Sequence, residues 1–191
     1  MSILMASSVV QWAEECAHEM LGDLRPRIDH VLAVGAKARR IASAFDDVDA
    51  EVLVASAYLH DIGYAPELVD TGLHQIDGAR WLRSQGHEDL AGLVAHHSAA
   101  HVELRLRGRL QALEPYRRPA YALSAALAYC DITTGPHGQD VTLDERIAEV
   151  GDRRRRDSVV YRALVAARPE LEGAVRLTSN RLAELRVVTS V

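Results

Sequence analysis

The 191-residue sequence has few cysteines, few aromatic residues and no excess of positive charge, and each shortage excludes a class of protein. Two cysteines, Cys16 and Cys130, are too few for a disulfide framework, and both lie in apolar, helix-like stretches that predict buried free thiols. The formal net charge of −5 gives no electrostatic attraction to a nucleic-acid polymer. The apolar runs are all shorter than the roughly 18 residues that a membrane-spanning helix needs.

The first residues, Met1–Met5, have no basic residue ahead of their apolar side chains. They therefore match neither a signal peptide nor a transit peptide. From this we expect a cytoplasmic protein whose partners include neither a membrane nor a nucleic-acid polymer.

The composition favours helices over strands, because aromatic residues are only 5% of the chain and Ala, Leu, Val and Arg dominate. Apolar residues recur with the helical period, and no stretch alternates as a strand would. We expect an all-α helical bundle forming one domain over residues 1–191, with a core at about 27–138 and C-terminal helices at 142–187 packing on it. The predicted helices lie near residues 9–21, 26–42, 50–60, 76–84, 89–97, 119–131, 143–150, 158–167 and 170–186. The helices after about residue 142 could supply the interface of a homodimer.

The run Arg153–Arg156 is the one dense block of charge in the sequence. Acidic residues flank it, among them Glu149 and Asp157. This arrangement predicts a solvated helix end whose charges pair with one another, rather than a patch that binds phosphate.

The pair His60-Asp61 ends the most apolar predicted helix, which Asp49 could cap. Burying an ionised carboxylate is costly unless a cation accompanies it, so a metal ion is the simplest explanation for this pair. His30 and Asp131 lie on other apolar helical faces and could complete the site. Two imidazoles and two carboxylates suit Mn, Fe, Co, Ni, Zn or Mg, with positions left open for water and substrate.

The order His30…His60-Asp61…Asp131, with Leu-His-Asp-Ile-Gly around the central pair, resembles the HD superfamily of metal-dependent phosphohydrolases. The similarity runs from about residue 27 to residue 138. It implies an all-α bundle with a divalent metal site between core helices. It also implies that Asp61 takes part in catalysis.

Two further histidines resemble those that bind a second ion in the HD proteins with two metals. His74 opens the helix after the central pair, and His97 belongs to a His-His-Ser stretch before the last aspartate. Adjacent helical residues point about 100° apart, so His96 and His97 rarely serve one site equally. We prefer His97 as the ligand, because His-Ser resembles the family's His-Thr pattern. A pair of His97 with His101 is an alternative. With two ions, the resemblance implies that Asp61 bridges them and that an activated water is the nucleophile.

Anionic substrates need cationic partners. Arg27 lies one turn before His30 on the same face, where the family often has an arginine, and it is our candidate for binding phosphate. Lys37, two turns after His30, is a weaker candidate, and Glu67 could orient water or act as a base.

The resemblance implies a phosphohydrolase that uses metal-activated water on a small phosphorylated metabolite, for which we expect a nucleotide or dinucleotide. The segment Gly63–Glu67 lacks the acidic pair of alarmone hydrolases and the signature of cyclic-di-GMP phosphodiesterases. Two alternatives stay open: a di-iron oxygenase of the HD type, since the same ligands suit iron, and a non-catalytic HD binding module.

Overall fold

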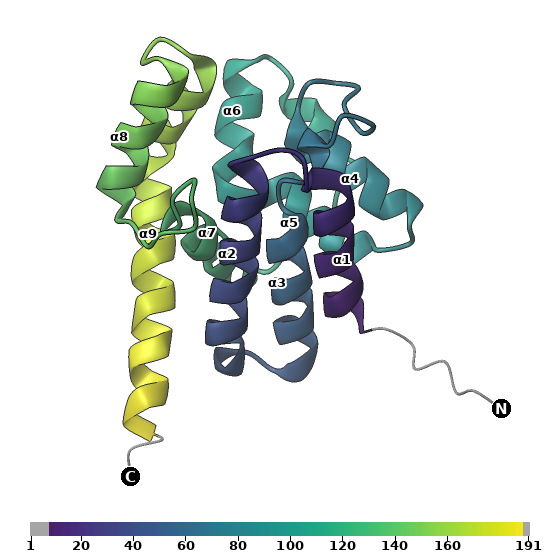
Figure 1. Cartoon of the computed structure of the whole chain (residues 1–191). Coiled ribbons are helices and arrows are strands. Elements are labelled where there is room, and N and C mark those ends of the chain that lie inside the picture. The colour runs from purple at the N-terminus through teal and green to yellow at the C-terminus, as the bar shows by residue number, and fades with distance from the viewer. Residues whose placement is uncertain (1–7, 189–191) are drawn as a thin grey trace, which may run out of the picture.

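The computed structural model describes residues 8–188, and within this range the chain is helical, without a β-strand (Figure 1). The predicted all-α fold is confirmed. The α-helices are α1 (Val9–Leu21), α2 (Arg27–Ile41), α3 (Asp47–Leu59), α4 (His74–Ser84), α5 (Glu88–His96), α6 (Ala100–Leu106), α7 (Tyr121–Ile132), α8 (Leu143–Arg154) and α9 (Val159–Val188). Short 3-10 helices are η1 (Ala42–Ala44), η2 (Ile62–Tyr64), η3 (His97–Ala99) and η4 (Leu110–Leu113).

The N-terminal segment considered for a targeting signal lies outside the described residues. Among those that are described, no helix combines the length and the apolar character needed to cross a membrane.

Helix α3 is the centre of the bundle and packs against α1, α2, α5 and α7. Every residue from Leu53 to Leu59 is buried, because this helix is apolar on all faces. Its cap differs from the expected one: the Asp46 side chain, not that of Asp49, accepts the hydrogen bond at the helix start, and it does so from the Asp49 amide. The helix therefore begins three residues earlier than predicted and still ends at the His60-Asp61 pair.

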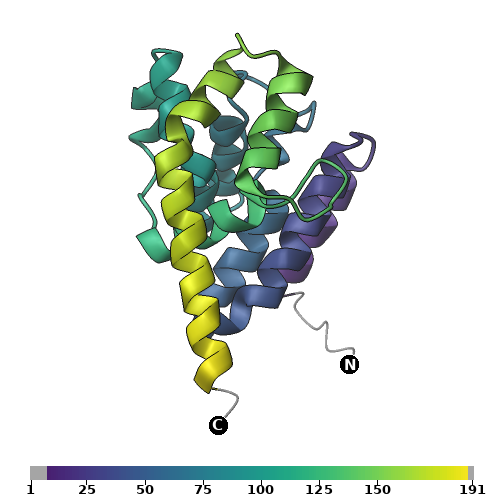
Figure 2. The same cartoon turned by 90° about the vertical axis from the view of Figure 1, so that its left-hand side faces the viewer.

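Helices α8 and α9 lie together on one side of the bundle, opposite α1 (Figures 1 and 2). The sequence predicts two separate helices at 158–167 and 170–186, but the structure has one continuous helix, α9, with Pro169 inside it. A proline inside a helix removes one backbone hydrogen bond. Here Ala167, Leu171 and Ala174, on both sides of the proline, are buried against α7, and this packing keeps the helix continuous.

Helices α2 and α3 approach closely where Gly35 faces the ring of Tyr58. A Cβ atom at Gly35 would lie only 2.4 Å from Tyr58 Cε1. Tyr58 is buried, and its hydroxyl accepts a hydrogen bond from Arg39, so the ring has little freedom to move away. Glycine is therefore required at this helix crossing.

We expect Gly35→Ala to destabilise the fold by about 1–3 kcal/mol, the typical cost of overpacking a core. Thermal unfolding followed by circular dichroism measures this. The matched control is Gly173→Ala in α9, where the new Cβ would meet Tyr121 at an ordinary contact distance of 3.6 Å. Since alanine favours helices, the control should be neutral or slightly stabilising. Equal melting temperatures for the two variants would contradict the close approach.

Candidate metal centre

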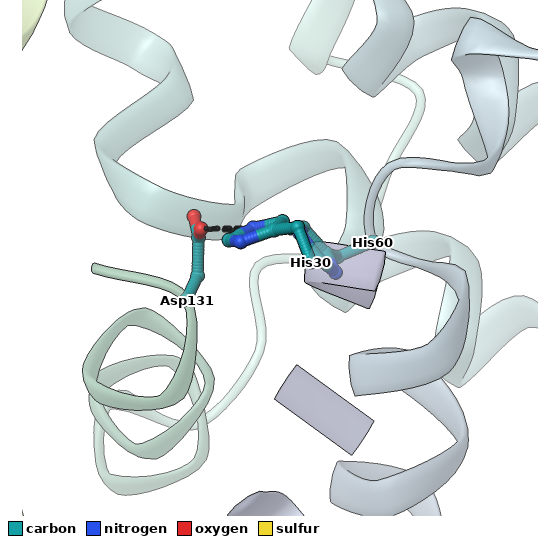
Figure 3. A group of neighbouring side chains, drawn as sticks. All are labelled: His30, His60 and Asp131. Atoms are coloured by element: carbon teal, nitrogen blue, oxygen red, sulfur yellow. Dashed lines mark hydrogen bonds and ion pairs between the residues drawn. The ribbon is translucent and has the colours of Figure 1, made fainter. Parts of the chain in front are cut away.

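The six residues predicted as metal ligands come from five parts of the chain and meet inside the bundle. They fall into two groups of three, and within each group the possible ligand atoms all lie within 4.8 Å of one another. The first group is His30, His60 and Asp131 (Figure 3), and the second is Asp61, His74 and His97. Helix α2 supplies His30, the end of α3 supplies the His60-Asp61 pair, α4 begins with His74, His97 follows α5, and Asp131 lies near the end of α7.

In the first group, His30 Nε2 lies 3.0 Å from Asp131 Oδ1, and His60 Nε2 lies 3.9 Å from the same oxygen. The rings of His30 and His60 meet edge to face, with their centroids 5.4 Å apart. All three residues are buried. Two imidazole nitrogens and one carboxylate oxygen thus converge on one small volume.

In the second group, Asp61 Oδ1 lies 3.3 Å from His74 Nε2 and 4.0 Å from His97 Nε2. The other carboxylate oxygen, Oδ2, lies 3.5 Å from His60 Nε2 in the first group. The two oxygens of Asp61 therefore face different groups. This places Asp61 between them, as the resemblance to two-metal HD proteins implies.

Backbone carbonyls orient three of the four imidazoles. The Nδ1 atoms of His60, His97 and His30 lie 2.8, 2.6 and 3.2 Å from the carbonyl oxygens of Ala57, Val94 and Gly135. Because a carbonyl oxygen only accepts, each Nδ1 must donate. In a neutral ring this leaves the lone pair on Nε2, which faces the cluster. Such outer hydrogen bonds are typical of histidines that bind metals.

The electrostatics keep these groups in the protonation states that bind a cation. Burial by itself raises the pKa of the Asp61 carboxyl, but the positive charge of Arg27 outweighs it and holds the pKa well below its usual value. At Asp131, burial is likewise outweighed by the contact with His30 and by the positive charge of Arg146, so its pKa is lowered. Burial lowers the pKa of His74 and His97. The carboxylates of Asp61 and Asp131 are therefore ionised, and the imidazoles of His74 and His97 are neutral.

One buried nitrogen of the cluster has no hydrogen-bond partner. His60 Nε2 is fully buried and accepts no hydrogen bond, although its ring is held in place by the bond from Nδ1 to Ala57. A buried polar atom without a partner is costly, and a cation at this position would satisfy it. The donor set of imidazole nitrogens and carboxylate oxygens suits a divalent transition metal. The residues present therefore fit the metal that the resemblance implies.

A cavity of about 120 Å³ opens beside the cluster and is lined by Asp61, His74, His97 and Asp131. Arg27 also lines it, as predicted for a residue that binds substrate. Its guanidinium pairs with Asp61 and lies 4.0 Å above the ring of Tyr64. An adjoining cavity of about 380 Å³ shares Arg27 and Tyr64 with the first. The cluster thus faces a space that a small ligand can enter.

Other candidates lie elsewhere. His96 Nε2 faces the backbone carbonyl of Tyr116, and His101 pairs with Glu170 at 3.4 Å, so neither belongs to the two groups. Lys37 does not face the cavity beside the cluster: its ammonium donates to the backbone oxygen and hydroxyl of Thr133 and pairs with Asp140. Its role is to hold the chain that follows α7. Glu67 is exposed and lines neither cavity.

Sequence reasoning missed several residues of the site. Tyr64 stacks on the His74 ring at 4.2 Å, Arg146 of α8 lies 4.0 Å from Asp131, and the Ser98 hydroxyl donates to Asp131 Oδ2. The expectation for the arginine run is half right. Arg153 and Arg155 pair with neighbouring acids, but Arg153 and Arg154 also line both cavities. Only the packing of α8 against the bundle brings these side chains to the site.

The chain belongs to the HD-domain family: the HD domain model matches residues 27–156. This is a superfamily of metal-dependent hydrolases, and its members bind divalent metals. Searches of curated proteins and of solved structures found no match. The matched range contains all six residues of the cluster and extends to the arginine run of α8.

We expect Asp61→Asn, which keeps the shape and removes the charge, to weaken metal binding at least about 100-fold, because Asp61 faces both groups of ligands. Metal analysis of purified protein and titration of apo-protein with Zn²⁺ or Mn²⁺ measure this. Asp29→Asn is the matched control, since Asp29 pairs with Arg25 outside the two groups. Unchanged metal content in the Asp61 variant would refute the metal centre.

Ser98 offers a second test. It and Ala99 have left-handed backbones (φ 46° and 59°), and this turn directs the Ser98 hydroxyl to Asp131. We expect Ser98→Ala to keep the fold and to weaken metal affinity about tenfold, the lower end of the usual effect of losing an outer hydrogen bond. The same metal titration measures it. An affinity equal to that of the wild type would show that the hydroxyl does not position Asp131.

Proposed function

We propose that this HD-domain protein is a phosphohydrolase that uses metal-activated water on a small phosphorylated metabolite. The observation that carries the proposal is the arrangement of two groups of three ligands around Asp61, beside a cavity that Arg27 also lines. Nitrogen and oxygen ligands with open positions are typical of hydrolytic metal sites.

His30, His60 and Asp131 would hold one ion, and Asp61, His74 and His97 would hold a second. When bound, divalent ions supply the activation of water and the polarisation of the phosphoryl group. The chain contributes a fixed arrangement of ligands, because helix ends and carbonyl hydrogen bonds hold the side chains before any ligand arrives.

Arg27 is the residue that would bind and neutralise the substrate phosphate. Its side chain is 20% exposed, and it lines both cavities while contacting Asp61. The ring of Tyr64 lies between the guanidinium and His74, so the arginine is held in one orientation. An arginine fixed in this way can stabilise the charge that builds up on a transferring phosphoryl group.

Tyr64 would act as a neutral hydrogen-bond donor. Burial, with a smaller contribution from the negative charge of Asp61, raises the pKa of Tyr64 to about 12. Its hydroxyl therefore stays protonated at neutral pH. A neutral donor next to Arg27 favours an anionic ligand without adding a competing negative charge.

We predict a nucleotide or dinucleotide as the metabolite. The cavity beside the cluster, of about 120 Å³, suits a phosphate group but is small for a nucleoside. The remainder of such a substrate would occupy the adjoining cavity of about 380 Å³. The two cavities lie side by side, since Arg27 and Tyr64 line both of them.

The test is a panel of phosphorylated metabolites, nucleotides included, with release of inorganic phosphate from Mn²⁺- or Zn²⁺-loaded protein as the readout. We expect turnover by the wild type and by Asp29→Asn, and none by Asp61→Asn. Arg27→Gln should keep its metal and lose about 100-fold in kcat/KM, the usual cost of removing a group that stabilises developing charge. Turnover only by iron-loaded protein with consumption of oxygen would instead support an oxygenase. Metal binding without any turnover would support a binding module.

A further inference from the structure

The cavity of about 380 Å³ next to the metal centre has walls rich in arginine. Five arginines line it, together with one acidic residue, Asp23: they are Arg25, Arg27, Arg146, Arg153 and Arg154. Arg25 lies just before α2 and Arg27 begins it, whereas the other three come from α8, which is far away in sequence. Four of the five also line the cavity beside the metal ligands, so the two spaces share one cationic boundary.

One of these arginines has no carboxylate partner. Glu149 pairs with both Arg146 (2.7 Å) and Arg153 (2.5 Å), and Arg146 also lies 4.0 Å from Asp131. Arg25 pairs with Asp29, and Arg27 pairs with Asp61. Within residues 8–188, Arg154 has no ion-pair partner. Its positive charge is therefore available to an anionic ligand in the cavity.

Arg154 belongs to α8, yet it lines this cavity together with Tyr64 of η2. Arg155 and Arg156 follow in the same run and line neither cavity. The run thus divides: its first half turns toward the site, and its second half does not, because the helix ends at Arg154 and Arg155 adopts a left-handed backbone (φ 68°).

We propose that this arginine-lined cavity binds a second anionic group of the substrate, a phosphate or a group of similar charge, so that the substrate carries two phosphates. The inference rests on the proposed function, since it takes the reacting phosphate to lie at the metal centre. Guanidinium groups suit phosphate because they donate paired hydrogen bonds. A cleft lined by several arginines attracts a multiply charged anion more strongly than a singly charged one.

The first experiment asks whether the anion site exists without the metal. Metal-free protein is titrated with inorganic phosphate in a calorimeter at fixed ionic strength. We expect Arg154→Gln to bind phosphate about tenfold more weakly than the wild type, since it removes one charge-assisted partner. The matched control is Arg156→Gln, which makes the same change of charge two residues further on and should bind phosphate like the wild type. Equal affinities for the two variants would overturn the proposal.

The second experiment asks whether one ligand spans both sites. Metal-loaded protein is titrated with bisphosphates of straight-chain diols of increasing length and with the matching monophosphates. We expect one length of bisphosphate to bind at least about tenfold more tightly than its monophosphate. Arg154→Gln should remove this advantage, whereas Arg156→Gln should keep it. If no bisphosphate has an advantage in the wild type, the two-phosphate substrate is wrong.

The two experiments separate this inference from the proposed function. If the protein fails to bind metal, the phosphohydrolase proposal fails, but phosphate binding by metal-free protein still reports on the arginine cavity. If the metal-loaded protein hydrolyses monophosphates and shows no difference between the Arg154 and Arg156 variants, the function stands and the second anion site is overturned.

Discussion

The burial of two ionised carboxylates inside an apolar helical bundle is the constraint on which the rest of the structure depends. Asp61 and Asp131 are 4% and 9% exposed, and their pKa values are lowered, so both are negatively charged in a medium that disfavours charge. Part of this cost is offset because Arg27 pairs with Asp61 and the Ser98 hydroxyl donates a hydrogen bond to Asp131. Helices α2 and α4 begin beside these carboxylates, and α3, α5 and α7 end there, so the ligands come from the ends of helices.

The sequence predicted those features that follow from local rules. The helical period and the scarcity of aromatic residues indicated an all-α fold, and a His-Asp pair at the end of an apolar helix indicated a cation. The helix breaks at His97, whose ring lies toward Asp61, while His96 turns to Tyr116. The six predicted ligands lie in two groups of three, an arrangement that no single segment of the sequence displays.

The features that the sequence missed depend on contacts between distant segments. Arg146 and Arg154 had no local sign of a role, because acidic neighbours at helical spacing make any arginine resemble part of a solvated surface. The sequence predicted two helices, at 158–167 and 170–186, where the structure has one, because local rules ignore the packing of α9 on α7. Lys37 looked like a phosphate ligand on the face of His30, yet its long side chain reaches the chain after α7. In each case tertiary packing decided between two readings that the local sequence allowed.

The spacing of the ligands along the chain has a consequence for how the protein folds. Residues 30 and 131 meet at 3.0 Å although about half of the sequence separates them, and an ion held there would link α2 to α7 and, through Asp61, to α3 and α4. The unfolded chain does not bring these ligands together, so it has no such site. The free energy of binding the ion therefore adds to the free energy of unfolding. Cellular supply of the metal would then set how long each copy of the protein survives proteolysis as well as how well it works.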